Sequence, residues 1–577
     1  MIYPLETCKR EITSALSKTI SLLYHCDTDI KLETPPSPGY GDYTYPCFPL
    51  ASKAKKSPKD IAEEIVKKVE KNRWITHIEA KNGYINIFLN MQHLAEETLK
   101  TILKMQDRYG TLPAKKKRII IEHTSANPNG PLHVGRARNP IIGDTLVRLH
   151  RFAGYDVESQ FYLDDMGKQV AILTYGIKHV KPEIIPSADI DKPDHRYVGF
   201  YQIANKMMEE DERIQEEINE IIRKAETGDK KTLQMIKEAY TPVIEGIKQS
   251  LKRINITIDI YIEESTFVID KSVNKIIDEL RKTTYCNEED GALYLDLAEF
   301  DIKGRNTRFY LTRRDGTTLY ATRDIAYHKW KADHADELIN VLGEDHKLEA
   351  KQVEIALKLL GVKKIPRVIF YAFVSLPEGK MSTRRGRVVY LDELIDEAVT
   401  HAYEEVKKRR GDELSETQMS SIAEIVGIGA LRFNIIKIQP EKDIVFKWED
   451  ALNFEGNSAP FIQYAHARAC SILAKNTEKT LSTDIPIDLH PTERELILQL
   501  SRFPEFIEKA TNECKPHILA SYLLDIASAF NQFYRDCPVL TENDNEKRNM
   551  RIRLVDAVRI TLKNGLELLG ITAPIEM

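Results

Sequence analysis

Residues 118–136 read RIIIEHTSANPNGPLHVGR, and this stretch decides the fold. Arg118–Glu122 is a short apolar run of the kind that forms a buried parallel strand. A polar segment rich in proline and glycine follows, and then a helical pattern over His133–Ala153 that Gly154 is placed to cap. A strand that passes through such a loop into a helix is the starting unit of nucleotide-binding α/β sheets, so we expect a ligand at this turn.

The turn at His133-Val134-Gly135-Arg136 carries side chains suited to phosphate chemistry. His133 and Arg136 are three residues apart, so they share one face of the first helical turn. Gly135 lets a nucleotide approach the backbone closely, and the helix N-terminus adds free N–H groups. We predict that these groups bind a nucleotide and stabilise charge that develops on its phosphate. The alternative is an ordinary strand-to-helix turn.

Strands and helices continue to alternate beyond this turn. We expect further strands at Val157–Leu163, Leu338–Leu342 and Arg367–Tyr371, and a helix that ends at Leu360 before Gly361. This order predicts an α/β fold with a doubly wound parallel sheet, and its ligands should lie beyond the carboxyl ends of the strands.

The flanking regions have other patterns. Residues 1–113 form an α+β unit, with a helix at Pro58–Lys71 and a strand at Gly83–Leu89, and the lysines at 115–117 are interpreted as a solvated linker. Residues 114–414 form the nucleotide fold, and a charged helical insertion occupies about 184–286. Residues 415–577 form an all-α bundle with aromatic residues at helical spacings.

Composition limits the classes of partner. The formal net charge is −5, so the chain can bind nucleic acid only through local basic patches. None of the seven cysteines is paired as CxxC, which argues against a structural zinc site and a disulfide framework. We find no signal peptide and no apolar run of membrane-spanning length, so we expect a cytoplasmic protein without a membrane partner.

A second polar site lies at Gly379–Gly386, GKMSTRRG, where three basic side chains have no acidic neighbour within the loop. We predict that residues 375–390 form a mobile loop that closes on a triphosphate. The predicted contacts are Lys380, Met381, Ser382 and Arg384. A solvated basic loop explains the charge equally well.

The pair HVGR and KMSTR, in this order, resembles the HIGH and KMSKS motifs of class I aminoacyl-tRNA synthetases. Five stretches resemble arginyl-tRNA synthetases, especially the archaeal kind: IEHTSANPNGPLHVGRARNPIIGD, FYLDDMGKQ, DGTTLYATRDIAYH, NVLGEDH and QYAHARACSIL. The resemblance covers nearly the whole chain. It implies a monomer that activates arginine with ATP and Mg²⁺, without zinc, and transfers it to the terminal ribose of its tRNA. It also implies that activation requires bound tRNA.

Two positions depart from the family motifs. Arg136 stands in place of the second histidine of HIGH, and it offers positive charge but no neutral imidazole. Thr383 stands in place of the second lysine of KMSKS, so Lys380, Arg384 or Arg385 must supply that charge. The resemblance makes His133, Arg136, Lys380 and Arg384 the candidate catalytic residues.

An arginine pocket requires acceptors for a planar guanidinium with five donors, and carboxylates provide the best geometry. The resemblance assigns this role to Tyr320 and Asp324, one helical turn apart in LYATRD. Spacing alone favours Asp324 as a helix N-cap after the turn at Asp315-Gly316. Further positions that match the family near the substrate are Glu122, which would receive the α-ammonium, Ser125, Asn127, His346 and Gln169.

The two ends of the chain are the candidate tRNA-binding regions. The resemblance makes 1–113 a domain that contacts the tRNA elbow and 415–577 an anticodon-binding bundle. Tyr464 and Arg468, one turn apart in QYAHAR, are the preferred anticodon pair, although most aromatics there should be core residues. Tyr84 and Asn86 alternate on one strand face and could contact RNA, or Tyr84 could be buried.

Three other functions compete with this interpretation. Another class I synthetase, specific for cysteine, methionine or lysine, would be expected to carry metal-type cysteine or histidine clusters. A small-molecule nucleotidyltransferase would not require the helical tail or the N-terminal unit. A synthetase-like RNA-binding protein without catalysis is supported only by the departures at Arg136 and Thr383.

Overall fold

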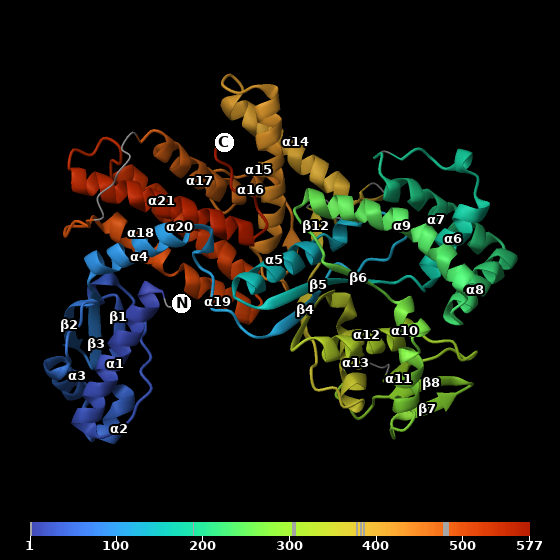
Figure 1. Ribbon diagram of the computed structural model, residues 1–577, viewed down its shortest axis with the longest axis horizontal. Helices are drawn as coiled ribbons and strands as arrows, with labels where there is room; N and C mark the ends of the chain where they lie inside the picture. The colour runs from blue at the N-terminus through green and yellow to red at the C-terminus, as the bar shows by residue number, and fades with distance from the viewer. Residues whose placement is uncertain are drawn as a thin grey trace.

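A five-stranded sheet lies at the centre of the chain in the computed structural model, which describes residues 3–188, 190–302, 307–376, 379–380, 383–384, 387–476 and 484–577 (Figure 1). Its strand order is β11-β10-β4-β5-β6, and all neighbours are parallel. The strands are β4 (Arg118–Glu122), β5 (Asp156–Leu163), β6 (Ile260–Glu263), β10 (Glu337–Gly343) and β11 (Arg367–Tyr371). The predicted doubly wound sheet is confirmed, and its order reverses between β4 and β10, where a ligand crevice is expected.

Helices bury both faces of this sheet. Ile119 and Ile121 of β4 pack with Ile142 of α5 (Arg138–Phe152) on one face. Ile120 points to the other face and packs with Ala332 of α12 (Tyr320–His334). Because neither face of β4 meets water, its sequence is a continuous apolar run and not an alternating one. Helix α13 (Lys347–Leu359) connects β10 to β11.

The helical insertion is shorter than the predicted range of 184–286. Its helices α7 (Pro193–Glu210), α8 (Glu212–Glu226) and α9 (Lys230–Arg253) pack with α6 (Lys168–His179) at the right of Figure 1. Strand β6 lies within the predicted range but pairs with β5 as an edge of the central sheet. Because β6 has only four residues, its pattern was too weak to separate it from the charged helices around it.

The N-terminal unit lies apart from the central sheet, at the lower left of Figure 1. It contains an antiparallel sheet of order β1-β3-β2, made of β1 (Tyr43–Pro46), β2 (Ile75–Lys81) and β3 (Tyr84–Leu89). Helices α1 (Pro4–Tyr24), α3 (Pro58–Lys68) and α4 (Met91–Met105) accompany this sheet. Helix α4 and the segment after it contact the C-terminal bundle, where the Tyr109 hydroxyl donates to the Leu500 carbonyl at 2.7 Å.

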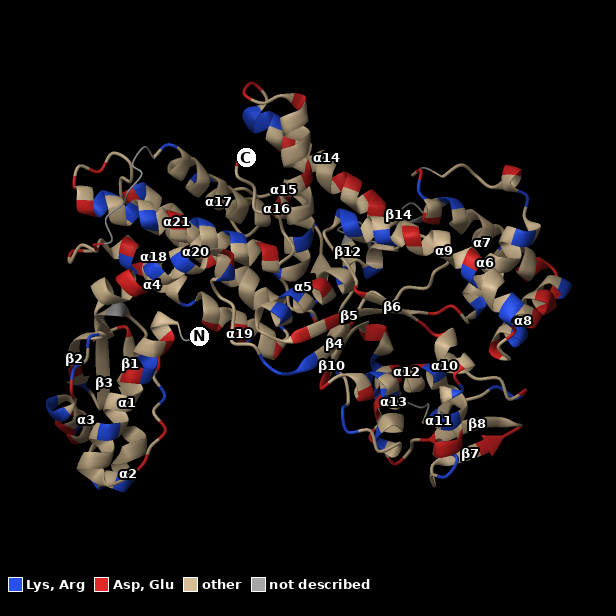
Figure 2. Cartoon of the chain, in the orientation of Figure 1, with Lys and Arg blue, Asp and Glu red and all other residues tan. Residues whose placement is uncertain are grey.

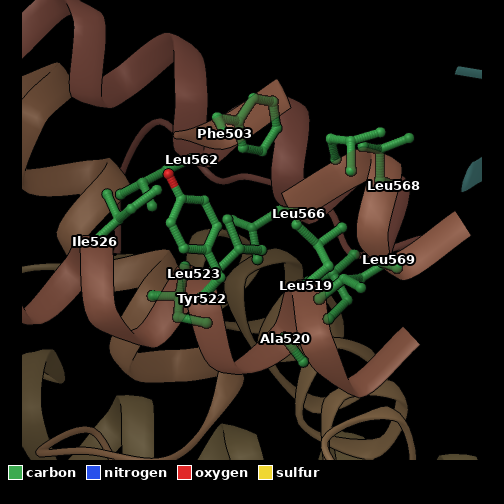
Figure 3. Close-up of a cluster of buried hydrophobic side chains, with 14 of the residues drawn as sticks. Phe503, Leu519, Ala520, Tyr522, Leu523, Ile526, Leu562, Leu566, Leu568 and Leu569 are labelled. Carbon is green, nitrogen blue, oxygen red and sulfur yellow. The ribbon is translucent and has the colours of Figure 1, made fainter. Parts of the chain in front are cut away.

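The C-terminal region is a bundle with a shared apolar core. Its helices are α15 (Glu416–Ile436), α17 (Ala459–Ala474), α18 (Pro491–Ser501), α19 (Phe503–Glu513), α20 (Pro516–Asp536) and α21 (Asn545–Leu568). Phe503, Leu523 and Leu566 meet in this core (Figure 3). Gly565 permits the close approach of α20 and α21, because a Cβ there would lie 2.3 Å from a methyl group of Leu523.

One short strand shows that the region beyond 415 is not all-helical. Strand β16 (Ile444–Val445) pairs in parallel with β12 (Val374–Leu376), which follows β11. Two residues give no periodicity that a sequence could reveal. This pairing connects the bundle side of the molecule directly to the strand that leads into KMSTR.

Among the described residues, one helix, α15, has the length and composition of a membrane span. Within its most apolar window, 67% is buried inside the protein. It packs against α14 (Leu391–Arg410), and a Cβ on Gly427 would lie 2.6 Å from the Ala398 carbonyl oxygen. Packing against neighbouring helices therefore accounts for its apolar character. Figure 2 shows both charge signs interspersed on the surrounding helices.

Candidate active site

The loop after β4 has a strained backbone that fixes its side chains. Thr124 and Ser125 have positive φ angles of 73° and 34°, which non-glycine residues rarely adopt. Asn139 of α5 supports this conformation, because its Oδ1 accepts from the Thr124 amide at 2.7 Å and its Nδ2 donates to the Val341 carbonyl at 3.0 Å. The Ser125 hydroxyl then donates to Oε1 of Glu122 at 3.1 Å.

The HVGR turn differs from the predicted continuous helix. It is a 3₁₀ turn over Val134–Arg136, and α5 begins only at Arg138. His133 is the N-cap of this turn, and its Nδ1 accepts a hydrogen bond from the Gly135 amide at 3.0 Å. Because Nδ1 accepts, a proton on the neutral ring resides on Nε2. A 3₁₀ turn brings residues three apart onto one edge, so His133 and Arg136 still share a side.

A buried arginine joins the HVGR side of the molecule to the strand before KMSTR. The Arg138 guanidinium is fully buried and donates to the carbonyls of Ala372, Gln439 and Lys442, each at 2.7 Å. Burial lowers the pKa of Arg138 to about 10. The carbonyls stabilise its cation and hold the start of α5 against the segments before β12 and β16.

A cavity of about 700 Å³ opens at the HVGR turn. The predicted residues Asn127, His133, Gly135, Arg136 and Gln169 line this cavity. Its lining also includes Phe373, Val374, Ser375, Asp345 and Asp443. Its position beside a helix N-terminus and a glycine suits a nucleotide.

The second predicted basic site is described only in part. Ser375 pairs with Lys380 between β12 and β13 (Gly379–Lys380), so the Lys380 backbone lies beside a residue that lines the nucleotide cavity. Residues Met381, Ser382 and Arg385, and the side chains of Lys380 and Arg384, lie outside the described residues. Which cation replaces the family lysine stays a prediction.

A second cavity, of about 640 Å³, lies next to the first. The predicted arginine-binding residues Glu122, Ser125, Asn127, Tyr320, Asp324 and His346 line it. Asn127 lines both cavities, and its Nδ2 donates to Oε1 of Gln169 at 2.8 Å. Gln169 therefore lies on the nucleotide side and not in the cavity to which it was assigned. The shared wall allows two substrates to meet at Asn127.

The N-cap alternative for Asp324 is wrong. Helix α12 begins at Tyr320 with Leu319 as its N-cap, which places Asp324 inside the helix with its carboxylate at the cavity. Burial opposes its ionisation, but His328, whose Nδ1 lies 3.0 Å away, and Lys331 hold the pKa of Asp324 below its ordinary value. A carboxylate that stays ionised in a cavity is suited to bind a guanidinium.

A buried polar network connects the two ends of the second cavity. The fully buried Lys331 ammonium donates to Oε2 of Glu122 at 2.6 Å and to Oδ1 of Asn340 at 3.0 Å. Nδ2 of Asn340 lies 2.7 Å from Nε2 of His328, whose other nitrogen faces Asp324. Since an amide nitrogen only donates, His328 accepts at Nε2 and carries its proton at Nδ1. Lys331 was not predicted, because α12 also carries Lys329 and nothing in the sequence distinguishes the buried lysine from the surface one.

Two further acidic residues of the cavity were also missed. Glu264 follows β6 and is 1% exposed, and its Oε1 lies 2.9 Å from Nε of Arg323. Burial raises the pKa of Glu264 well above its ordinary value. Oε2 of Glu264 and Oδ1 of Asp164 are buried without a hydrogen-bond partner among the described residues. Carboxylate oxygens without a protein partner at a cavity can accept from a ligand with several donors, as guanidinium has.

The predicted anticodon pair is accompanied by a third residue. The Arg468 guanidinium lies 4.7 Å from the Tyr464 ring and 5.1 Å from the Tyr534 ring. Tyr464 and Tyr534 are 40% and 44% exposed, and they line an open cavity of about 850 Å³ with Met577. The two exposed rings, with the Arg468 guanidinium near both, form a surface on which a base can stack.

Tyr84 and Asn86, the pair predicted to contact RNA, differ in their exposure. Tyr84 is 37% exposed and its ring lies 5.2 Å from that of Phe48, which is 50% exposed. Asn86 is 2% exposed, and its Oδ1 accepts from Thr44 at 3.0 Å. Asn86 is therefore not retained as an RNA contact, because it is buried within the sheet. Phe48 was not predicted, since it lies outside the strand.

A parallel sheet with a cavity at the HVGR turn, joined to a second cavity lined by carboxylates, is consistent with the catalytic fold of class I aminoacyl-tRNA synthetases. Residues 98–448 match the family of tRNA synthetases class I (R), catalytic domain, residues 6–89 match the arginyl tRNA synthetase N terminal domain, and residues 462–577 match the DALR anticodon binding domain. The chain belongs to the arginyl-tRNA synthetase family.

Curated relatives and a solved structure agree with this assignment. The chain is 48% identical over 530 residues to the arginine–tRNA ligase of Methanocella arvoryzae, with 92% of each chain covered. It is 45% identical to that of Methanothermobacter thermautotrophicus, with 98% and 97% covered. The arginyl-tRNA synthetase of Thermus thermophilus aligns with a TM-score of 0.81 and 29% identity, over 98% of this chain and 100% of that one.

Proposed function

We propose that this chain activates arginine with ATP to arginyl-adenylate and transfers it to the 3′-terminal ribose of its tRNA. The observation that carries this proposal is the pair of adjacent cavities that share Asn127. One is built on a helix N-terminus with His133 and Arg136, and the other contains carboxylates with unsatisfied oxygens. Two substrates held side by side react as if intramolecular.

The nucleotide cavity binds ATP. His133, Gly135 and Arg136 contact the phosphates, and Met381, Ser382, Lys380 and Arg384 complete the ATP site. The arginine carboxylate attacks the α-phosphate in line, and His133, Arg136, Lys380 and Arg384 stabilise the charge that develops there. Asp345 and Asp443 line this cavity and would offer oxygen ligands to Mg²⁺ bound with ATP, and the ion would supply positive charge beside the phosphates. The reaction requires no zinc.

The second cavity recognises arginine. Asp324, Glu264 and Asp164 accept from the guanidinium, and the ring of Tyr320 packs beside it. Glu122 receives the α-ammonium while Lys331 balances its buried charge, and Ser125 fixes its orientation. Asn127 and Gln169 orient the carboxylate toward ATP. His346, paired with Glu349 at 3.0 Å, borders the entrance.

The tRNA contacts lie at the two ends of the molecule. Tyr464, Arg468 and Tyr534 stack on anticodon bases, and Tyr84 with Phe48 contacts the tRNA elbow. Bound tRNA is required before arginine is activated. The protein acts as a cytoplasmic monomer.

Pyrophosphate exchange with each amino acid, with and without tRNA, tests the proposed function. Arginine alone should support exchange, and only when tRNA is present. Exchange with lysine or cysteine in place of arginine would show that arginine is not the substrate. Exchange without tRNA would remove the tRNA requirement, and no exchange with any amino acid would favour an RNA-binding protein without catalysis.

A further inference from the structure

A buried charged cluster lies outside both cavities, where the insertion meets the first turn of α14. Lys192 and His195 flank the start of α7, Ser250 comes from α9 and Asp392 from α14. Oδ2 of Asp392 lies 2.7 Å from the Lys192 ammonium, 2.9 Å from the Ser250 hydroxyl and 3.1 Å from Nε2 of His195. Asp392 is fully buried, so these donors replace water around its charge.

The cluster has the spacing of a metal site but contains its own cation. Ligand atoms of Asp194, His195 and Asp392 lie within 4.8 Å of one another. The Lys192 ammonium is 2.7 Å from Asp392 and 3.5 Å from Asp194, and the Arg253 guanidinium lies 3.5 Å from the other oxygen of Asp392, so fixed cations already balance these carboxylates. We therefore interpret the cluster as a buried ion-pair network and not as a metal centre.

Helix α7 packs without spare room both against α9 and against the loop before the HVGR turn. A Cβ on Gly246 of α9 would lie 2.2 Å from Oδ1 of Asp194. A Cβ on Gly130, in the loop before the HVGR turn, would lie 2.6 Å from a methyl group of Val198 in α7. Helix α7 therefore contacts both the cluster and the loop that precedes His133.

The cluster is connected to His133 through a short series of contacts. The His195 ring lies 5.2 Å from the ring of Tyr390, edge to face. Tyr390 pairs with His133 in an antiparallel bridge. On either side, the Val134 amide donates to the Val389 carbonyl at 3.0 Å, and the Leu391 amide donates to the Leu132 carbonyl at 2.8 Å. The backbone of the HVGR turn is thus held by the residues that immediately precede Asp392.

We propose that Lys192, His195 and Asp392 are positioning residues for adenylate formation, through which the insertion sets the placement of the HVGR turn at the nucleotide cavity. None of the three lines either cavity. Asp392 fixes the start of α14, the segment 389–391 fixes the backbone of His133, and His133 faces ATP. This inference rests on the proposed function, because it assigns ATP to the cavity that His133 lines.

The geometry predicts which kinetic constants the cluster controls. The nucleotide cavity contains His133, whose backbone the cluster holds through Tyr390. The arginine cavity is held by a different network, through Lys331 and Asn340, which shares no residue with the cluster. Loss of the cluster should therefore impair the use of ATP and leave the recognition of arginine intact, because independent networks are energetically additive.

Steady-state pyrophosphate exchange with saturating tRNA tests the proposal on the full chain. Lys192→Met and Asp392→Asn should each lower kcat/KM for ATP by roughly 10- to 100-fold, the usual cost of a displacement of about 1 Å at reacting groups. The KM for arginine should stay at the wild-type value. The double variant should be no worse than the poorer single variant, because both changes remove the same network.

Lys248→Met is the matched control, since Lys248 is on α9 and forms an exposed ion pair with Glu245 at 2.7 Å. It should retain wild-type constants. Thermal unfolding of each variant shows whether a loss of activity comes from loss of folding. If Lys192→Met or Asp392→Asn does not fold, His195→Gln, which removes the ring against Tyr390, is tested in its place. The proposal is overturned if folded variants keep the wild-type constants for ATP, or if the KM values for arginine and ATP rise together. An inactive wild-type chain would overturn the proposed function itself.

Discussion

The two cavities are built in different ways, although they share a wall. The nucleotide side depends on one short stretch, in which His133 caps its own turn through the Gly135 amide. The arginine side depends on residues from β4, β6, α12 and β10, joined by Lys331, Asn340 and Arg323. A phosphate can be bound by a single helix N-terminus, whereas a guanidinium requires carboxylates from several directions. The first kind of site is local in sequence and the second is not.

The largest expected effect is the loss of the buried cation of the arginine side. Lys331→Met leaves Glu122 buried and unpaired, so the free energy of unfolding should fall by about 3–5 kcal/mol. Denaturant unfolding measures this change. Lys329→Met is the control, because Lys329 is on the same helix and pairs with Glu279 at the surface. If the free energy of unfolding falls by a similar small amount in both variants, the network does not stabilise the cavity.

The next effect belongs to the nucleotide side. His133→Asn removes the imidazole that we propose stabilises the phosphates, and kcat for exchange should fall by about 10²- to 10³-fold, the cost of losing one donor at developing charge. The KM for arginine should be unchanged. A rise in that KM would show that the two cavities are not energetically separate.

Asp324→Asn should affect arginine alone. The neutral amide retains the shape of the carboxylate but loses one charge-assisted pair, so the KM for arginine should rise by roughly 10- to 100-fold. The KM for ATP is the internal control. Equal rises for both substrates would indicate that Asp324 has a structural role.

The smallest expected effect is a pH dependence on the arginine side. The pKa of Glu264 is raised by burial, and a bound guanidinium favours its ionised form. Arginine binding should therefore weaken as the pH falls below the raised pKa of the free enzyme, by at most about tenfold per pH unit for one proton. The KM for arginine is measured against pH. In Glu264→Gln, its rise at low pH should disappear, because that variant has no carboxyl group to protonate at this position. A wild-type profile in that variant would assign the titration to another group.

Several corrections show where local patterns lose information. Strand β6 has four residues within a charged helical region, so its place in the central sheet could not be predicted. Asn86 alternates correctly with Tyr84 along the strand, but hydrogen bonds within the sheet hold it inside. The spacing around Asp324 suggested an N-cap, yet α12 begins one turn earlier, at Tyr320. In each case the tertiary partner, and not the local pattern, decided the outcome.

The sequence by itself determined four of the five strands of the central sheet and the position of the HVGR turn. The apolar run of β4 and the loop after it depend on contacts among neighbouring residues, which spacing reveals, whereas the helix predicted from His133 begins only at Arg138, after a 3₁₀ turn. Only the tertiary structure decided that Lys331 neutralises Glu122, that Glu264 offers an unsatisfied oxygen to the arginine cavity, and that Lys192 neutralises Asp392. The reason is physical, because a buried charge requires a partner and only the fold decides which residue lies beside it. Lys331 is 209 residues from Glu122 along the chain. Arg323 is 59 residues from Glu264.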